Sequence, residues 1–377
     1  MKLIERNHCV ISGNEDLELL YSFKDFPVFM GCVDHPPEKD LKADMNWWIS
    51  RSTGSIQLNP LLPLEILYQE QHAGSVGKLW EEHHKEFAKF ITGYQCRNVL
   101  EIGGAHGLLA REYMSSVDGV NWTMLEPNPN LQEDIDINVI KGFFDDKFQF
   151  SGDIDAVVHS HVFEHVYEPG KFIEHISAFL GEGGLHLFSV PRMQVMLEMC
   201  YTNCINFEHT VFLTEIFVDY LLAKNGFSII EKRYYHDNHS IFYATKKTGN
   251  KYLKFPPMAY DGNREIYEQF ISNHLAVVVE INKHIAGHDG PVYLFGGHVF
   301  SQYLIGFGLD ENKIECILDN DTNKQGKRLY GTSLMVQSPK ILKDVKNAAV
   351  VLRAGVYNNE IKKDILQNVN PDVDFWE

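Results

Sequence analysis

The sequence lacks four features that would each indicate a particular class of protein. No apolar run reaches the roughly 18 residues of a membrane span, and the amino-terminal MKLIERNHCVISG lacks the apolar stretch of a signal peptide. Six cysteines in 377 residues are too few for a disulfide framework. Lys and Arg number 34 against 51 Asp and Glu, and the net charge of −17 disfavours a nucleic-acid partner. We therefore expect a cytoplasmic, globular chain without a membrane or nucleic-acid partner.

Two common nucleotide-binding motifs are also missing from the glycine-rich segment VLEIGGAHGLLA, residues 99–110. The G-x-G-x-x-G spacing of dinucleotide-binding folds is absent, which disfavours a nicotinamide oxidoreductase. The Gly-Lys-Ser/Thr sequence of a phosphate loop is absent as well, which disfavours ATP phosphates. A ligand of this turn should therefore carry no phosphate.

The segment from 98 to about 247 alternates apolar strands with amphipathic helices. This alternation is typical of a parallel sheet that is covered on both faces. The expected parallel strands are residues 98–103, 121–127, 138–144, 154–160 and 184–191. A short polar link joins 227–235 to 240–247, so these two strands should pair as an antiparallel hairpin. This pattern predicts an α/β fold with a class I methyltransferase core of the Rossmann-like type.

The length of the chain implies two or three domains. Residues 1–75 are Pro-punctuated and predict a small irregular domain, and the central domain should span 76–250, beginning with a helix over 76–91. After a linker and a long helix over 264–287, residues 291–297 and 314–320 predict two further parallel strands. Residues 251–377 should therefore form a second, smaller Rossmann-like α/β domain.

The glycine-rich turn is the strongest candidate for a cofactor site. Gly103, Gly104 and Gly107 let the backbone approach a ligand closely, and a helix that starts near Gly107 directs its positive end there. Glu126 ends the next strand about 20 residues later, where an acid can accept both ribose hydroxyls. S-adenosyl-L-methionine (SAM) fits this site because it has a free ribose diol, an amino-acid end and no phosphate. The alternative is a tight turn that binds nothing.

We assign a set of residues around this turn to the cofactor: Glu101, Gly103, Gly104, His106, Gly107, Glu126, Pro127, Phe144 and His161. His106 stands where an acidic or polar group is expected. It either contacts the methionine end of the cofactor or caps the helix, and the sequence leaves both open.

Two further polar segments follow predicted strands of the central domain. HSHVFEHVYEP (159–169) lies at the carboxyl end of the fourth strand, where open α/β sheets bind ligands, and we expect His165 to reach the substrate. A metal site is disfavoured because alternate residues of a strand face opposite sides, so we expect no metal. In 203–214, Glu208 and His209 form a candidate pair of orienting acid and general base, or else a simple surface pair.

Three motifs carry a resemblance to a known family. Residues 318–334 are similar to a D-x-N-x-x-K-Q-G-x-x-x-x-G-T segment, 293–304 to a Y-G-A strand-turn-helix, and 204–214 to an I-Y-H-E-H segment. With these motifs, the whole chain resembles the three-domain SAM-dependent C-methyltransferases that act on nucleotide-linked 4-keto-deoxysugars in deoxysugar biosynthesis. The resemblance implies SAM as cofactor and a small nucleotide sugar as substrate.

The resemblance also implies roles for individual residues. His209 would abstract the proton next to the sugar ketone with Glu208 as its partner, giving an enolate whose carbon takes the methyl group. His165 would help to polarise the substrate. Substrate-binding positions would be Asn206, Lys324 and Gly296.

The sequence departs from this family at several motif positions. The tyrosine of the I-Y-H-E-H segment, a candidate enolate stabiliser, is Asn206 here, and the histidine after it is Phe207. In the segment that covers the cofactor in relatives, His72 stands where an aromatic hydroxyl is expected, and a P-W-N sequence becomes AGV at 354–356.

Most of the paired cysteines that hold one zinc in relatives are also replaced by other residues here. The two motifs read Cys9-x-x-Ser12-Gly13 and Ser50-x-x-Thr53-Gly54. Ser and Thr are poor zinc ligands, and Cys32 would need a rearranged site, so we predict no structural zinc. The amino-terminal domain should instead be held by packing around Trp47 and Trp48.

Three functions therefore remain, in order of preference. The first is carbon methylation of a nucleotide-linked keto-deoxysugar. The second keeps the cofactor but methylates oxygen or nitrogen of a sugar, because His209 can equally deprotonate a hydroxyl. The third is a non-catalytic relative that binds a nucleotide sugar or S-adenosylhomocysteine. The sequence leaves the oligomeric state open, with a monomer slightly favoured.

Overall fold

The computed structural model describes residues 2–68, 77–131, 135–252, 254–255 and 258–377. The chain forms two compact units. Unit 1 comprises Met1–Leu19, Trp47–Met196 and Asn206–Arg264, and unit 2 comprises Leu20–Asn46, Leu197–Ile205 and Glu265–Glu377. These boundaries differ from those expected at 75 and 250, and a division into three consecutive domains stays a prediction.

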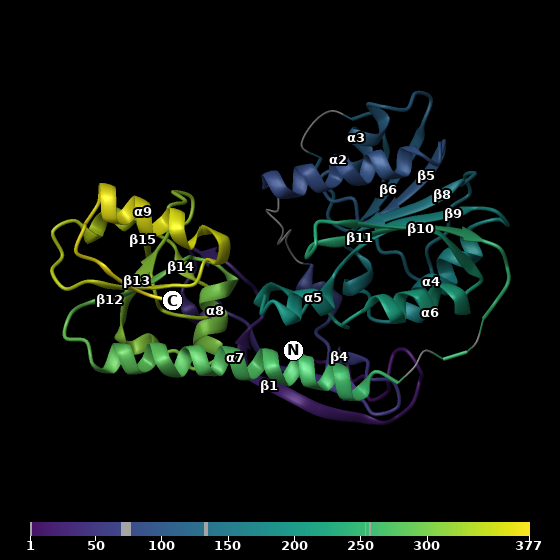
Figure 1. The fold of residues 1–377 in the computed structure, drawn as a ribbon. Coiled ribbons are helices and arrows are strands. Elements are labelled where there is room, and N and C mark those ends of the chain that lie inside the picture. Colours follow the sequence, from purple (N-terminus) through teal and green to yellow (C-terminus); the bar gives the residue numbers. More distant parts are fainter. Residues whose placement is uncertain (1, 69–76, 132–134, 253, 256–257) are drawn as a thin grey trace. The chain divides into compact units, whose positions relative to one another are not determined.

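Unit 1 contains a seven-stranded sheet in the order β10-β11-β9-β8-β5-β6-β7 (Figure 1). Its strands are β5 (Asn98–Ile102), β6 (Asn121–Glu126), β7 (Asn138–Lys141), β8 (Ala156–Ser160), β9 (Leu185–Pro191), β10 (Phe227–Tyr235) and β11 (Ser240–Lys247). β5 to β9 run parallel, whereas β11 is antiparallel to both β9 and β10. The predicted parallel strands, the terminal hairpin and the Rossmann-like methyltransferase core are thus confirmed.

Helices cover both faces of this sheet, because the side chains of its central strands are buried on both faces. α2 (Lys78–Thr92) and α3 (Leu108–Met114) lie on one face, and α4 (Pro169–Phe179) and α6 (Glu215–Lys224) on the other (Figure 1). In β8, Val157 packs in the core with α4 and α6, whereas its neighbours Ala156 and Val158 pack with α2 and α3. This period of two is what buries a parallel sheet on both sides.

The amino-terminal region carries more regular structure than its Pro-punctuated sequence indicates. β1 (Leu17–Pro27), β3 (Lys42–Ser50) and β4 (Ile56–Leu58) form a sheet in the order β1-β3-β4, and the short helix α1 (Leu64–Leu67) follows. Trp47 is fully buried with its ring 5.1 Å from that of Phe212, and the indole nitrogen of Trp48 donates to the carbonyl of Asn59 at 2.8 Å. Trp47 therefore packs in the core of this region as expected, and Trp48 is held by its hydrogen bond to Asn59.

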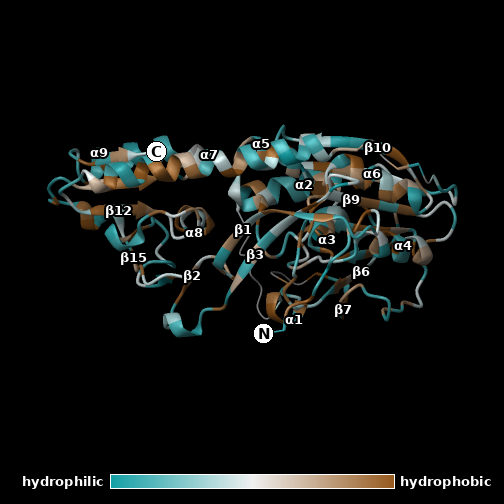
Figure 2. Ribbon diagram, turned by 90° about the horizontal axis from the view of Figure 1, so that it is seen from below, coloured by the Kyte–Doolittle hydropathy of each residue, from teal (hydrophilic) through white to brown (hydrophobic). Residues whose placement is uncertain are grey.

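Unit 2 has a five-stranded parallel sheet in the order β15-β13-β12-β16-β17. Its strands are β12 (Val292–Phe295), β13 (Ile314–Leu318), β15 (Val336–Gln337), β16 (Ala349–Leu352) and β17 (Asp374–Trp376), and a separate two-stranded ladder joins β2 (Cys32–Val33) to β14 (Arg328–Leu329). β12 is hydrophobic along its length, whereas α9 (Asn358–Asn368) carries many hydrophilic residues (Figure 2). The two predicted strands at 291–297 and 314–320 are confirmed as a parallel pair.

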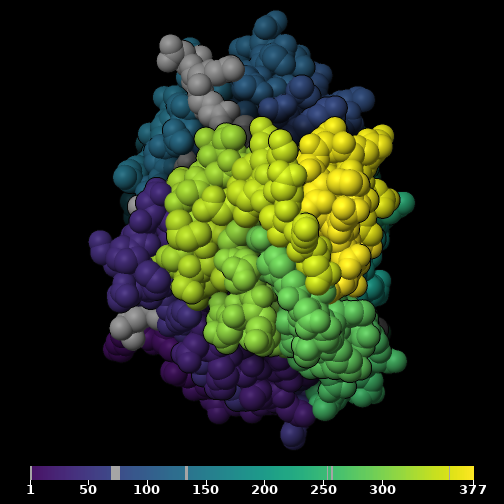
Figure 3. Space-filling model, turned by 90° about the vertical axis from the view of Figure 1, so that its left-hand side faces the viewer, coloured from purple at the N-terminus to yellow at the C-terminus, as the bar shows by residue number. Residues whose placement is uncertain are grey.

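Three helices belong with this second sheet. They are α7 (Tyr260–Ala286), α8 (Val299–Gly306) and α9, and α7 begins at the end of unit 1. The helix α5 (Met193–Glu198) runs from unit 1 into the short segment of unit 2 at 197–205. In the space-filling view, the yellow carboxyl-terminal segment lies beside the yellow-green segment that precedes it (Figure 3). No helix among the described residues is both long and apolar enough to cross a membrane.

Candidate functional site

The site of unit 1 lies where the strand order of its sheet reverses. The chain places β6 and β7 on one side of β5 and then returns to place β8 on the other side. Open α/β sheets bind ligands outside the carboxyl ends of the strands at such a point. The glycine-rich turn follows β5 and the histidine-rich segment follows β8, so both predicted segments share this edge.

The glycine-rich turn is built so that no side chain fits at its bends. Gly103 and Gly107 have φ of 74° and 72°, and Gly107 is the N-cap of α3. A Cβ on Gly103 would lie 2.6 Å from a methyl carbon of Val162, and one on Gly104 would lie 2.5 Å from the Met124 sulfur. Packing against neighbouring strands therefore requires these glycines, and the turn presents bare backbone on its open side.

Glu126 lies beside this turn with its carboxylate fixed by two backbone amides. One oxygen accepts from Ala105 N at 3.1 Å and the other from Asn128 N at 2.9 Å. Each carboxylate oxygen can accept more than one hydrogen bond, so acceptor sites remain for a ribose diol. The bare turn and the oriented acid fit a cofactor that has a diol and no phosphate.

Glu101 lies beneath the turn and supports it. Its side chain is 2% exposed, and one carboxylate oxygen accepts from the indole nitrogen of Trp122 at 2.8 Å. Burial raises the pKa of Glu101 to about 7, with a further rise from Glu126 opposed by the hydrogen bond from Trp122. Glu101 is therefore a support of the turn, and its role in binding a cofactor stays a prediction.

The other residues assigned to the cofactor lie in different surroundings. His106 Nδ1 is 2.9 Å from the carbonyl of Asn130, and both of its expected roles, contact with the cofactor and capping of α3, stay predictions. Pro127 follows β6 in the same loop. The ring of the partly buried Phe144 packs 4.4 Å from His175 and 5.4 Å from Phe179 on α4, and its contact with a cofactor stays a prediction.

Four titratable side chains after β8 and before α6 come together near this edge. His165 Nδ1 lies 3.7 Å from a carboxylate oxygen of Glu208, and its Nε2 lies 3.9 Å from Glu164. The rings of His165 and His209 meet edge to face with centroids 4.9 Å apart. The predicted catalytic residues Glu208, His209 and His165 are thus neighbours, and Glu164 joins them.

Burial and mutual charge shift these groups in opposite directions. Burial raises the pKa of Glu208 to about 7 and lowers that of His165 to about 4. Although burial opposes it, the hydrogen bond and charge of His161, with His165 and His209 nearby, lower the pKa of Glu164 to about 2. The cluster therefore holds one permanent carboxylate and one, Glu208, that changes charge near neutral pH, as acid–base sites do.

Sequence reasoning missed the residues that hold this cluster in place. The buried guanidinium of Arg6 donates to the carbonyls of Tyr167 and Thr210, which follow His165 and His209 in the chain. The Asn206 side-chain oxygen accepts from the backbone nitrogens of Glu208 and His209, both at 2.8 Å. This side chain therefore aims the pair, and its role in binding substrate stays a prediction.

Tyr68 is a second residue that the sequence did not single out. Burial raises the pKa of its phenol, and the nearby charges of Glu208, Tyr167, Glu164 and Glu126 raise it further. The phenol thus stays protonated between the acid beside the glycine turn and the catalytic cluster. It lies in the segment where we expected a hydroxyl, whereas His72 of that segment lies outside the described residues.

His159 and His161 point in different directions because His161 lies beyond the end of β8, where its φ of 52° departs from strand geometry. His159 Nε2 is 2.9 Å from His186 Nε2 within the core, whereas His161 Nε2 is 2.7 Å from the Ser240 hydroxyl. His161 is thus partnered toward the β10–β11 turn, and contact with a cofactor stays a prediction.

In the degenerate zinc motif, Cys9 Sγ lies 3.4 Å from the Thr53 hydroxyl, and Ser50 donates to Asp16.

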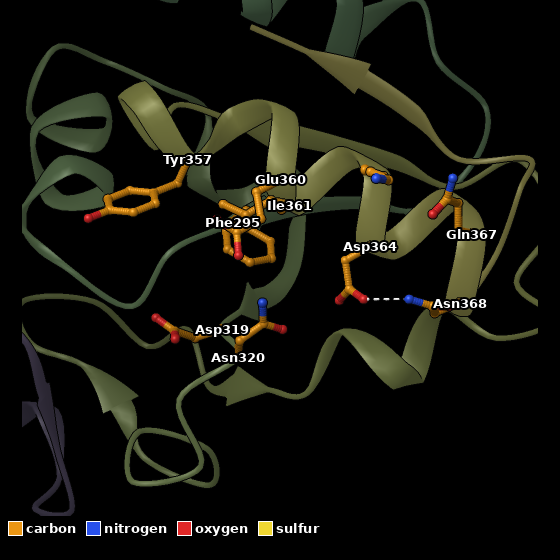
Figure 4. A pocket seen from close by; sticks show the side chains of 10 residues that line it. Phe295, Asp319, Asn320, Tyr357, Glu360, Ile361, Asp364, Gln367 and Asn368 are labelled. Carbon is orange, nitrogen blue, oxygen red and sulfur yellow. Dashed lines mark hydrogen bonds between the residues drawn. The ribbon is translucent and has the colours of Figure 1, made fainter.

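The predicted substrate residues of unit 2 lie near a pocket in that unit. The pocket has a volume of about 510 Å³, and its lining includes Phe295, Asp319, Glu360, Lys363, Asp364 and Gln367. Asp319 and Asn320 lie on one side and α9 on the other (Figure 4). Lys324 forms an ion pair with Asp319 at 3.0 Å, and Gly296, with φ of 109°, follows β12. Three carboxylates and one lysine give the lining an acidic character.

Comparison with known proteins assigns the central part of the chain to a domain type. Residues 69–232 match the family model described as a methyltransferase domain. This segment contains the glycine-rich turn, Glu126 and the Glu208–His209 pair. No curated protein matches the chain in sequence.

Solved structures that resemble this unit are methyltransferases of low sequence identity. The N-methyltransferase NodS from Bradyrhizobium japonicum WM9 is 15% identical, with 46% of this chain and 99% of that chain covered and a TM-score of 0.36. The mitomycin 7-O-methyltransferase MmcR is 12% identical, with 46% and 56% covered and a TM-score of 0.38. The plantazolicin methyltransferase BpumL, in complex with SAH, is 9% identical, with 45% and 83% covered and a TM-score of 0.36.

The family match and the sheet order agree with the geometry of the glycine-rich turn. Together they make residues 69–232 a SAM-dependent methyltransferase domain, with S-adenosyl-L-methionine as its cofactor.

Proposed function

We propose that the chain methylates the carbon next to the ketone of a nucleotide-linked keto-deoxysugar, with His209 as the general base. The observation that carries this proposal is the partly buried cluster of His209, His165, Glu208 and Glu164 at the same sheet edge as the glycine-rich turn. A C–H bond next to a carbonyl is acidic enough for a positioned imidazole when the enolate is stabilised.

His209, Glu208 and Glu164 each have a defined task in this reaction. When bound at the glycine-rich turn, SAM supplies an electrophilic methyl group. His209 takes the proton, and the C–H electron pair becomes the enolate. The enolate carbon then bonds the methyl group, and the C–S electron pair stays with sulfur in S-adenosylhomocysteine. Glu208 and Glu164 favour the imidazolium that His209 becomes.

Tyr68 supplies the hydrogen bond that the enolate oxygen needs. The family resemblance places a tyrosine at position 206, where this chain has asparagine. A buried phenol whose pKa is raised stays protonated and can donate to a developing oxyanion. Tyr68 therefore takes over this task from a different part of the chain.

The lining of the unit 2 pocket suits hydroxyl groups more than a diphosphate. Its carboxylates accept hydrogen bonds from hydroxyls and the Gln367 amide can also donate them, whereas the three carboxylates outnumber Lys363 and Lys324, the partner of Asp319. The nucleotide part of the substrate rests on the resemblance alone.

Oxygen methylation is the second candidate, and one observation favours it. Glu208 has a pKa raised to about 7, so the cluster holds a second group that can accept a proton from a hydroxyl near neutral pH. Such a reaction needs no enolate stabiliser and tolerates Asn206 in place of tyrosine.

An isotope experiment separates these reactions. We expect a keto-sugar nucleotide deuterated next to the ketone to lose one deuterium for each methyl group gained. Retention of all deuterium in the methylated product would contradict carbon methylation and support the oxygen acceptor. SAM binding without methylation of any keto-sugar nucleotide would point to a non-catalytic relative.

The base is tested with His209→Gln and, as a control, His236→Gln at an exposed position of the β10–β11 turn. We expect the first variant to bind SAM normally and to lose turnover by about 10²–10⁴-fold. The second should retain both. Full turnover in His209→Gln would remove this residue from the mechanism.

A further inference from the structure

We propose that unit 1 binds one divalent transition-metal ion, of the Zn²⁺ class, through His83, His161 and His239. These residues come from α2, the turn after β8 and the turn between β10 and β11. One ring nitrogen of each lies within 4.8 Å of the others, so small side-chain rotations would bring all three to the roughly 3.3 Å that separates tetrahedral ligands at Zn–N distances of about 2.0–2.1 Å. This site is separate from the cluster of His165, Glu208 and His209.

Two of the three histidines already point at one spot. His161 Nε2 and His239 Nδ1 lie 2.7 Å and 2.5 Å from the same oxygen, the hydroxyl of the fully buried Ser240. The hydroxyl can donate to one nitrogen and accept from the other, so it brings the two rings together without an ion. A cation beside the Ser240 oxygen would instead accept electron pairs from both rings.

His83 provides the independent evidence for a missing partner. Its side chain is 0% exposed, and neither ring nitrogen has a hydrogen-bond partner among the described residues. A buried polar group without a partner is unfavourable, and an imidazole has two such groups. The ring lies 5.1 Å from that of His161 and 5.1 Å from that of His239, centroid to centroid. A metal ion between the three rings would satisfy one of these nitrogens.

The surroundings of His161 match those of a metal ligand. Its Nδ1 lies 3.3 Å from a carboxylate oxygen of Glu164, while Nε2 faces the shared spot. Metal-bound histidines usually donate their second N–H to a carboxylate, which fixes the tautomer and the ring orientation. His161 also has φ of 52°, a conformation that a non-glycine residue keeps only where its surroundings require it.

The ligand set indicates which metal the site would take. Three imidazoles without thiolates or further carboxylates favour zinc and its late transition-metal neighbours over Mg²⁺ or Ca²⁺. Three protein ligands leave a fourth position for Ser240 or water. Because Glu164 links His161 to the catalytic cluster, the metal would fix one side of that cluster.

The test is the metal content of tag-free full-length protein after incubation with Zn²⁺ and removal of excess. We compare the wild type with His239→Gln, a change in a partly exposed turn, and with His236→Gln in the same turn as the matched control. We expect about one zinc per chain in the wild type and the control, and at least about a 10–100-fold weaker affinity in His239→Gln.

Binding is located by quenching of tryptophan fluorescence with Co²⁺. The Trp80 ring lies 4.8 Å from that of His161 and 5.2 Å from that of His239, so Co²⁺ in this site should quench it, and Trp80→Phe should abolish the quenching. Absence of stoichiometric zinc would overturn the proposal. Zinc that persists in His239→Gln but is lost in His209→Gln would also overturn it, because the metal would then lie at Glu164, His165 and His209.

Discussion

Replacing Glu101 by glutamine should stabilise unit 1 above neutral pH and leave its stability unchanged in acid. The carboxyl group is 2% exposed beneath the glycine-rich turn, and burial raises its pKa from 4.5 to about 7. Below pH 4.5 the group is protonated in both the folded and the unfolded chain, so its ionisation costs nothing there. As the pH rises from 4.5 towards 7, the unfolded chain loses this proton first, and the folded state loses stability.

The size of the effect follows from the two pKa values of Glu101. Each pH unit between 4.5 and about 7 corresponds to about 1.4 kcal/mol, so the full loss above neutral pH is about 3 kcal/mol. Glutamine has the shape of the protonated acid, and its carbonyl oxygen can still accept from Trp122. The variant should therefore match the wild type at pH 4.5 and exceed its free energy of unfolding by about 3 kcal/mol at pH 8.

Urea unfolding at several pH values, followed by tryptophan fluorescence, measures this difference. Glu174→Gln, at an exposed position of α4, is the control and should show no pH-dependent difference from the wild type. A constant difference between Glu101→Gln and the wild type from pH 4.5 to pH 8 would refute the reasoning. It would mean that Trp122 stabilises the carboxylate enough to offset its burial.

Three further predictions concern the site itself. Gly104→Ala should lower the free energy of unfolding by about 1–3 kcal/mol and weaken SAM binding in calorimetry, because its Cβ would overlap buried side chains. Gly142→Ala is the control and should change neither quantity, because its Cβ would make an ordinary contact of 3.7 Å. Burial raises the pKa of Glu208 to about 7, so its carboxylate forms as the pH rises through 7 and kcat should rise over the same pH range. An equal rise of kcat in Glu208→Gln would contradict this role of Glu208. Asn206→Ala removes the acceptor for two backbone amides and should lower kcat with little change in SAM affinity. Asn206→Asp keeps an acceptor oxygen and should therefore restore turnover. Equal loss in both variants would argue against this positioning role.

Local sequence patterns were sufficient to predict the central sheet and the cofactor turn. Alternating apolar residues, as in β8, determine which side chains face each layer, and they set the order of strands and helices along the chain. Gly103, Gly107 and Glu126 lie directly after strands, so the parallel arrangement alone brings them to one edge. The neighbourhood of His165, Glu208 and His209 follows for the same reason.

Residues that act through distant contacts were not predictable. Arg6 and Tyr68 lie far from His209 in sequence, and only tertiary packing brings them to the catalytic cluster. The rotation of a side chain beyond a strand end is equally undetermined, and nothing local indicated that Phe144 packs on α4. His83, on α2, showed no more than amphipathic spacing, and nothing local linked it to His239.

Binding of SAM to the wild type and to Glu126→Ala, by calorimetry on folded protein, tests the central claim most directly. Hydrogen bonds to a charged group contribute about 1.5–3 kcal/mol, so losing the acid that accepts the ribose hydroxyls should weaken binding at least about tenfold. Glu174→Gln should bind like the wild type. Failure of the wild type to bind SAM, or equal affinity in Glu126→Ala, would contradict the account.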